Sequence, residues 1–214
     1  MLSHRPRILI ADEQNLFAEL CKTLLEPEFQ IVGIVDNGHA AVRAAIRLVP
    51  DLILIDVALP MLNGLEACAQ VKRIVPAVKI MFLTMNRDLE TIAGSFQRGG
   101  SGYVLKMCTS SELLVAVRRV LQGHIYISET LPKDDINYRR RQHRGWRDSD
   151  AHLTVRQREV LQLLAEGKVM KEIGNILSVK TRTVAFHKYR LMETLGATSN
   201  ADLVRYAVQH GIVN

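Results

Sequence analysis

The sequence predicts a doubly wound α/β domain with a five-stranded parallel sheet, a long linker and an all-α domain of four short helices. Short, non-alternating apolar runs recur through the first half at helix-length intervals, which is typical of a parallel sheet buried on both faces. The second half shows helical periods, and the stretch between the halves shows neither pattern. We expect the α/β domain at residues 5–122, the linker at 123–149 and the helical domain at 150–214.

Four of the five expected strands end at a polar residue. The strand at 8–11 is followed by Asp12 and Glu13, and the one at 52–55 by Asp56. The strands at 80–83 and 103–105 are followed by Thr84 and Lys106, and a further strand is expected at 31–35. Because the carboxyl ends of parallel strands gather at one edge, where open α/β sheets bind ligands, we expect these side chains to meet there.

Apolar residues at helical spacing fill the stretches between these strands. The first helix carries Leu16 and Leu20 and should end before Pro27, where a helix cannot continue. Another begins after Asn63, and the last follows Ser110 and Ser111, which we take as its N-terminal caps. Five strands alternating with five helices make a doubly wound domain.

The predicted cluster suits phosphoryl chemistry. Asp12, Glu13 and Asp56 would repel one another unless a cation neutralises them, and oxygen ligands with room for water suit Mg²⁺. Asp56 would act as the nucleophile that accepts a phosphoryl group, with Lys106 and Thr84 binding its oxygens. Each residue alone has a plainer explanation, such as a helix cap or a surface charge, but their joint occurrence at strand ends favours the functional interpretation.

The charge of the 214-residue chain is divided unevenly. Residues 123–214 hold 15 of the 28 Lys and Arg but 10 of the 22 Asp and Glu, and so carry most of the formal net charge of +6. This favours a polyanion-binding module, although a solvated basic face would explain the charge equally well. The 3 cysteines are widely spaced and predict free thiols. We expect a cytoplasmic protein with no membrane partner, because no apolar stretch approaches the roughly 20 residues of a membrane span.

Four short helices are expected in the last 65 residues or so. Thr154 and Gln157 fit a capping box at the start of the first, and Gly167 fits its end. The second has its apolar positions at 170, 173 and 177, the third spans 181–195 before Gly196, and the fourth spans about 200–210. Two helices joined by a tight turn, the second of them basic, indicate a helix-turn-helix motif.

The third of these helices has one apolar and one basic side. Val184 and Leu191 mark the side that faces the core, and His187 lies next to it as a packing residue. We expect the other side to enter the DNA major groove, where basic side chains hold phosphates or guanine edges. The candidate DNA-binding residues are Lys171, Arg182, Thr183, Ala185, Phe186, Lys188, Tyr189 and Arg190.

The first half resembles the receiver domain of two-component response regulators. The resemblance rests on Asp12-Glu13, on Asp56 followed by Pro60 and Gly64, on Thr84, and on the segment 102–106. It implies a flavodoxin-like fold, Mg²⁺ as cofactor, and a sensor histidine kinase that phosphorylates Asp56. It also implies that Thr84 and Tyr103 form a switch pair that moves inward when the phosphoryl group arrives. Met85, which follows Thr84, and Ala58, two residues beyond Asp56, depart from the usual pattern.

Residues 150–214 resemble the DNA-binding domain of LuxR-type regulators, through segments 153–161, 166–167, 171–173 and 183–187. The whole chain is thus similar to response regulators of the NarL/FixJ class, which implies double-stranded promoter DNA as a partner and a homodimer on that DNA. Lys180-Thr181 stands where the family often has Ser-Pro, so we expect Thr181 to cap the recognition helix.

The sequence therefore predicts a transcription regulator controlled by aspartyl phosphorylation, and not an enzyme. One alternative is a phosphate-independent DNA-binding protein with a silent receiver. Another is an aspartyl phosphatase, which would want a carboxylate two residues past its nucleophile, where this chain has Ala58.

Overall fold

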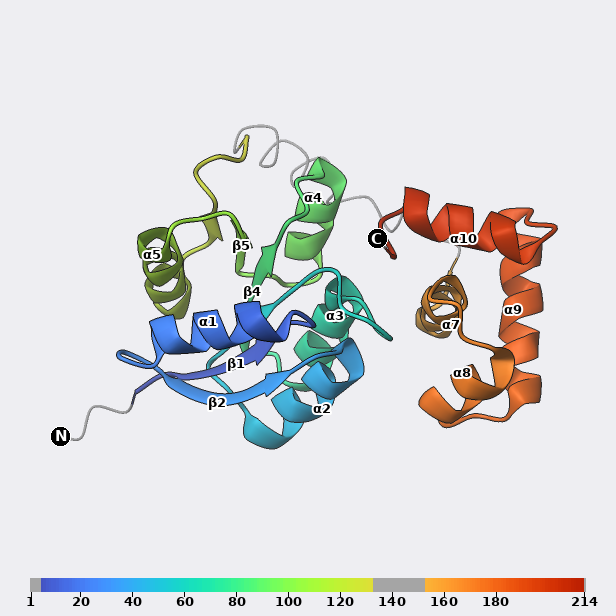
Figure 1. Ribbon diagram of the computed structural model, residues 1–214, viewed down its shortest axis with the longest axis horizontal. Coiled ribbons are helices and arrows are strands. Elements are labelled where there is room, and N and C mark those ends of the chain that lie inside the picture. Colours follow the sequence, from blue (N-terminus) through green and yellow to red (C-terminus); the bar gives the residue numbers. More distant parts are fainter. Residues whose placement is uncertain (1–4, 133–152, 214) are drawn as a thin grey trace. The chain divides into compact units, whose positions relative to one another are not determined.

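The computed structural model describes residues 5–132 and 153–213, which fall into two compact units, Met1–Arg144 and Gly145–Asn214. The first unit alternates strands and helices along the chain (Figure 1). Its elements are β1 (Arg7–Ala11), α1 (Asn15–Leu25), β2 (Gln30–Val35), α2 (Gly38–Leu48), β3 (Leu52–Ile55), α3 (Gly64–Ile74), β4 (Lys79–Thr84), α4 (Leu89–Gln97), β5 (Gly102–Leu105), α5 (Ser110–Leu121) and β6 (Tyr126–Ile127).

The strands form one parallel sheet in the order β2-β1-β3-β4-β5-β6. From β1 the chain first moves outward to β2 and then returns to build the other side from β3 onward. The order therefore reverses between β1 and β3, which is where doubly wound sheets bind their ligands. Asp12 and Asp56 follow these two strands directly, so the topology brings both carboxylates to the reversal point.

Each face of the sheet is buried by its own set of helices. Side chains of α1 and α5 form one core with the sheet, and side chains of α2, α3 and α4 form the other. The four residues of β3, Leu52–Ile55, are all at most 1% exposed. Burial on both faces is why these strands are uniformly apolar.

The predicted doubly wound α/β fold is confirmed, with two corrections in detail. A sixth strand, β6, lies inside the stretch predicted as linker, because a strand of two residues carries no readable sequence period. Helix α5 is capped by Thr109, whose side chain accepts from the N–H of Glu112, and not by Ser110 or Ser111. Residues 133–149 of the predicted linker, with Trp146, lie outside the described residues.

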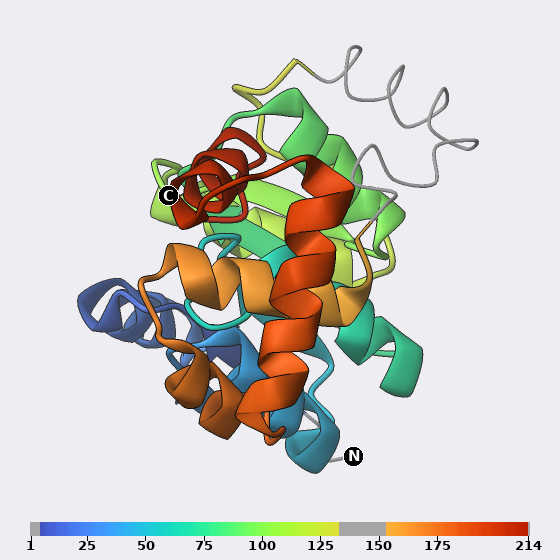
Figure 2. The same cartoon turned by 90° about the vertical axis from the view of Figure 1, so that its right-hand side faces the viewer.

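The second unit consists of α7 (Val155–Ala165), α8 (Met170–Ile176), α9 (Thr181–Leu195) and α10 (Asn200–Gln209). Helix α9 packs against both α7 and α8 (Figure 2). The predicted capping box is confirmed, since Thr154 Oγ1 accepts from the Gln157 N–H and Gln157 Oε1 accepts from the Thr154 N–H. Gly196 ends α9 at a φ of 63°, a left-handed conformation that favours glycine.

Two further sequence expectations bear on chemistry. Cys21, Cys68 and Cys108 are free thiols, and burial raises their pKa values to about 12, about 12 and about 11, so they carry little thiolate at neutral pH. Within the described ranges, no helix has both the length and the apolar character needed to cross a membrane.

Candidate functional site

Asp12, Asp56 and Lys106 form a buried cluster at the carboxyl edge of the sheet, which we call the carboxylate–lysine cluster. Lys106 Nζ lies 2.7 Å from Asp12 Oδ2 and 2.7 Å from Asp56 Oδ2. Asp12 is 3% exposed, Asp56 is 5% exposed, and the Lys106 side chain is 3% exposed. Three residues that are far apart in sequence thus meet at the end of β1, β3 and β5, as their positions at strand ends predict.

The pKa values of Asp12 and Lys106 are both shifted in the cluster. Burial raises the pKa of Asp12, and Asp56 adds to this, while hydrogen bonds from Lys106 and the Gln14 N–H act in the opposite direction. Burial alone would lower the pKa of Lys106, but its hydrogen bonds to Asp12 and Asp56 outweigh burial and raise the pKa above its usual value. Lys106 is therefore a permanent cation at neutral pH, and it offsets part of the repulsion between the carboxylates.

The local backbone fixes where Asp56 points. Its Oδ1 accepts from the Ala58 N–H at 3.2 Å. The backbone of Gly64 at the start of α3 lies against the Asp56 carbonyl, and a Cβ on Gly64 would come within 2.0 Å of that oxygen. Only glycine fits here, because any side chain would displace the strand end that carries the carboxylate.

Thr84 and Tyr103 are both buried and are joined through one residue of the β4–α4 loop. The Asn86 N–H donates to Thr84 Oγ1 at 3.3 Å, and the Tyr103 hydroxyl donates to the Asn86 carbonyl at 3.0 Å. The Tyr103 ring is 0% exposed, so it already occupies an inward position in this structure. Met85, which follows Thr84, is 56% exposed.

Two of the three predicted metal ligands meet, and the third does not join them. Glu13 is exposed, whereas Asp12 and Asp56 share the Lys106 ammonium. Within the described part of the chain, no group of three His, Cys, Asp or Glu side chains is placed to hold a metal ion. The donor set at the cluster is two carboxylates, which fits Mg²⁺, since this ion is commonly held by one or two carboxylates and completes its shell with water and phosphate oxygens.

Helix α9 has a buried and an exposed side, as predicted. Val184 and Leu191 are 0% exposed, while Phe186 is 56% and Tyr189 is 68% exposed. Arg182, Arg190 and Lys171 of α8 are also exposed, and the other candidates, Thr183, Ala185 and Lys188, are half-buried. All eight candidate DNA-binding residues thus keep some accessible surface.

The side chains along α9 differ in the contacts that they make. The Arg190 guanidinium lies over the Phe186 ring at 5.8 Å and pairs with Glu193 at 2.8 Å. His187 is half-buried, and burial together with nearby Arg156 lowers its pKa, in keeping with the packing role predicted for it. The expected Thr181 cap is wrong: Lys180 is the N-cap residue, without a side-chain cap, which leaves N–H groups of the first turn open to another acceptor.

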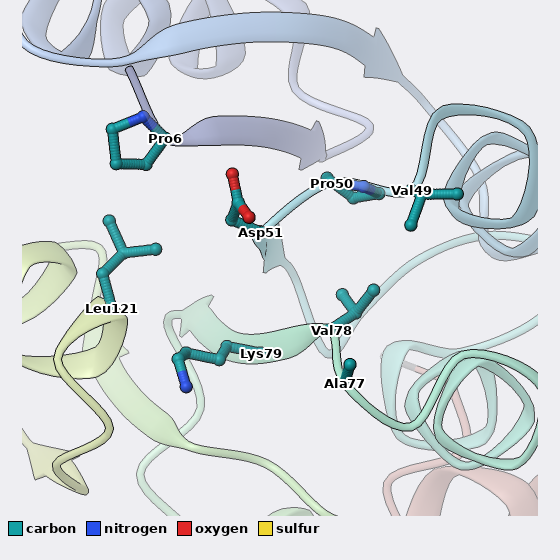
Figure 3. Close-up of a pocket in the computed structure, with 8 residues that line it drawn as sticks. All are labelled: Pro6, Val49, Pro50, Asp51, Ala77, Val78, Lys79 and Leu121. Carbon is teal, nitrogen blue, oxygen red and sulfur yellow. The ribbon is translucent and has the colours of Figure 1, made fainter. Parts of the chain in front are cut away.

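One hollow lies at the opposite edge of the sheet, where the strands begin (Figure 3). The Asp51 carboxylate points toward the start of β1, where it accepts from the Arg7 N–H at 2.7 Å. The lining residues are Pro6, Val49, Pro50, Asp51, Ala77, Val78, Lys79 and Leu121. Because all strands run in the same direction, this hollow is separated from the carboxylate–lysine cluster by the length of the sheet.

Sequence reasoning missed the residues that connect the site to its surroundings. Asn86 links Thr84 to Tyr103, and the Phe17 ring lies 4.8 Å from Lys106 Nζ. Ser128, in the predicted linker, bonds to β5. A loop asparagine and a linker serine carry no sequence signal of their own. Phe17 could have been suspected from its place in the first turn of α1, the helix that follows Asp12.

These features define a class of protein. A parallel α/β domain has buried carboxylates and a lysine at its carboxyl edge, and a separate four-helix unit presents an exposed basic helix. This is a receiver domain combined with a helix-turn-helix domain, as in proteins that convert phosphorylation into DNA binding.

Comparison with known proteins identifies the family. Residues 8–118 match the response regulator receiver domain, and residues 151–207 match the bacterial regulatory proteins of the luxR family. The chain is 30% identical to the transcriptional regulatory protein MctR of Rhizobium johnstonii, over 100% of this chain and 99% of that protein. It is 31% identical to DegU of Brevibacillus brevis, over 97% and 94%.

A solved structure of the RcsB response regulator from Salmonella typhimurium is similar in fold, with a TM-score of 0.63 at 22% identity, covering 96% of this chain and 98% of that one. The chain belongs to the response regulators that carry a receiver domain and a LuxR-type helix-turn-helix domain, and it is a phosphorylation-controlled transcription regulator.

Proposed function

We propose that Asp56 is the phosphoacceptor and that its phosphorylation controls DNA binding through α9. The observation that carries the proposal is the placement of one lysine ammonium 2.7 Å from each of two buried carboxylates at the reversal point of the sheet. A cation held against a carboxylate in a water-poor site is suited to stabilise the charge of an arriving phosphoryl group.

The phosphodonor in this proposal is a sensor histidine kinase. An Asp56 carboxylate oxygen forms a bond to phosphorus while the bond from phosphorus to the donor histidine nitrogen breaks, which leaves an acyl phosphate on Asp56 and a free histidine. Lys106 donates to the phosphoryl oxygens and Thr84 donates its hydroxyl hydrogen to one of them. Asp12 and Asp56 would hold Mg²⁺, which when bound would neutralise charge on the phosphoryl oxygens, and the exposed Glu13 next to Asp12 stays a predicted further ligand.

DNA recognition is assigned to the exposed side of α9. Lys188 and Arg190 contact phosphates, and Arg182 and Tyr189 lie where base edges would be read in the major groove of promoter DNA. Lys171, Thr183, Ala185 and Phe186 complete the contact surface, Ala185 and Phe186 through thymine methyls. The uncapped N–H groups at the start of α9 suit a DNA phosphate. Because its partner is chromosomal DNA, we place the protein in the cytoplasm.

We further propose that the phosphorylated protein binds DNA as a homodimer. One helix-turn-helix unit contacts a single half-site, and two linked units raise the apparent affinity through a high effective concentration. The half-sites should then be spaced by one or more turns of the double helix.

The test compares wild type with Asp56→Asn. Duplexes selected from a randomised pool by wild type with Mg²⁺ and beryllofluoride should be bound at least tenfold more weakly without beryllofluoride, and Asp56→Asn should not respond to it. Equal affinity in all cases would show a phosphate-independent DNA-binding protein with a silent receiver. Sustained hydrolysis of small phosphomonoesters would instead favour the phosphatase.

A further inference from the structure

Residues 126–131 lie along the outer edge of the sheet, and we call this segment the strap. Its first two residues form β6, which pairs in parallel with β5 at Gly102 and Tyr103. The Tyr126 N–H donates to the Ser101 carbonyl at 3.1 Å, and the Ser128 N–H donates to the Tyr103 carbonyl at 2.9 Å. The edge of β5 is thus covered by a segment that follows α5 in the sequence and precedes the DNA-binding unit.

Ser128 connects the strap to two elements at once. It is 1% exposed, and its Oγ accepts from the Leu105 N–H at 3.3 Å and donates to Glu112 Oε1 at 2.6 Å. Leu105 is the last residue of β5 and directly precedes Lys106. A buried hydroxyl that satisfies both its donor and its acceptor role fixes the strap against the strand end that carries the lysine.

The strap is also continuous with the pair Thr84 and Tyr103. Asn86 bonds to Thr84 through its N–H and to the Tyr103 hydroxyl through its carbonyl, while the Tyr103 backbone carbonyl bonds to Ser128. Ile127 and Leu131 of the strap are buried in the same apolar cluster as the Tyr103 ring. In this structure Tyr103 is in its inward position while the strap is bound to β5, and the two features share contacts.

We propose that the strap is the output element of the receiver: it responds to the position of Tyr103 and transmits it along the rest of the linker, with Ser128 and Glu112 as positioning residues. The proposal rests on Asp56 being the phosphoacceptor. If a phosphoryl group on Asp56 draws Thr84 and favours the inward Tyr103, it must also favour the bound strap. By reciprocity, loosening the strap must weaken binding of a phosphoryl mimic by the same factor.

Hydrogen exchange of the full chain, followed by mass spectrometry, tests whether a phosphoryl group on Asp56 favours the bound strap. The mimic is beryllofluoride with Mg²⁺, and the amides of residues 126–131 are compared with and without it. In wild type, the mimic should slow their exchange by about fivefold or more, the lower end of typical coupling between sites. Ser128→Ala should lose most of this slowing, whereas Thr130→Ala, which removes a hydroxyl from an exposed residue of the same segment, should retain it.

A beryllofluoride titration tests whether loosening the strap weakens binding of the mimic. Ser128→Ala should raise the concentration of mimic needed for half-maximal protection around Asp56 by about fivefold. Glu112→Gln keeps an oxygen acceptor of the same shape but removes its charge, and so should give a smaller shift with an intact fold. Thr130→Ala should titrate as wild type does.

The outcomes separate the strap from the proposed function. If the mimic protects residues around Asp56 in wild type while exchange in the strap stays unchanged, the strap proposal is overturned and the phosphoacceptor remains. An unshifted titration in both Ser128→Ala and Glu112→Gln also overturns it. If the mimic changes nothing around Asp56 in wild type, the proposed function and the strap proposal fail together.

Discussion

The carboxylate–lysine cluster and the exposed side of α9 use charge in opposite ways. In the cluster, three charged side chains are 3% to 5% exposed, and one ammonium lies 2.7 Å from each of two carboxylates. On α9, basic and aromatic side chains extend into solvent, with Tyr189 at 68% exposure. Removing one partner of a buried ion pair is costly because it leaves an uncompensated buried charge, whereas exposed charges contribute little to stability and remain available for a partner. Substitutions at the cluster should therefore change stability and function together. Substitutions on the exposed side of α9 should change DNA binding with little effect on stability.

The largest effect is expected from Lys106→Met. Removing the cation leaves two buried carboxylates without their partner, and the loss of such a partner costs about 3 kcal/mol or more of unfolding free energy. Denaturant unfolding measures this loss. Mg²⁺ should restore more stability to the variant than it adds to wild type, because it supplies the missing positive charge. If Mg²⁺ stabilises neither protein, Asp12 and Asp56 do not bind the ion.

The two sides of α9 provide the next contrast. Leu191→Ala removes a fully buried side chain and should cost about 3 kcal/mol of unfolding free energy. Tyr189→Ala removes a larger but exposed side chain and should change stability by less than about 0.5 kcal/mol while reducing affinity for the selected duplex. Chemical denaturation and a DNA titration on the same samples measure both. A Tyr189 variant that loses stability without losing affinity would place this residue in the core instead.

Arg182 and Lys188 should contribute to DNA binding in different ways. Arg182→Ala should cost about 1–3 kcal/mol of binding free energy on the preferred sequence and change the order of preferred bases. Lys188→Ala should weaken binding to all sequences alike and reduce the slope of log affinity against log salt by about 1. Binding to a duplex library at several salt concentrations measures both. An unchanged sequence ranking in Arg182→Ala would exclude base reading by this residue.

The smallest effect is a pH dependence in α10. Asp202 accepts hydrogen bonds from the Ser199 side chain and from Thr198, and these lower its pKa from 3.8 to about 2. Because the folded-state pKa is depressed, the stability that Asp202 contributes is present above about pH 4 and is lost as the pH falls toward 2. The difference in melting temperature between wild type and Asp202→Asn should therefore shrink over this range. A difference that stays constant with pH would contradict this account of Asp202.

The strand ends could be predicted from the sequence because burial on both faces forces an uninterrupted apolar run, and such a run ends visibly at Asp12, Asp56, Thr84 and Lys106. Helix boundaries were readable where side chains act locally, as in the capping box of Thr154 and Gln157. The two faces of α9 followed from helical geometry alone. In each of these cases one local rule is sufficient.

Features that depend on distant contacts could not be predicted. Strand β6 is two residues long and exists because β5 offers it an edge, and Ser128 is buried because Glu112 and Leu105 surround it. Glu13 follows Asp12 in sequence yet is exposed, while the ammonium of Lys106 contacts both buried carboxylates. The connection from Thr84 to Tyr103 passes through a backbone carbonyl of Asn86, which every residue possesses.

Mass spectrometry of the chain after incubation with acetyl phosphate and Mg²⁺ tests the central statement most directly. We predict a single added phosphoryl group, located on Asp56 in wild type and missing in Asp56→Asn. A wild-type chain that stays unmodified at residue 56 under these conditions would contradict the proposed mechanism of control.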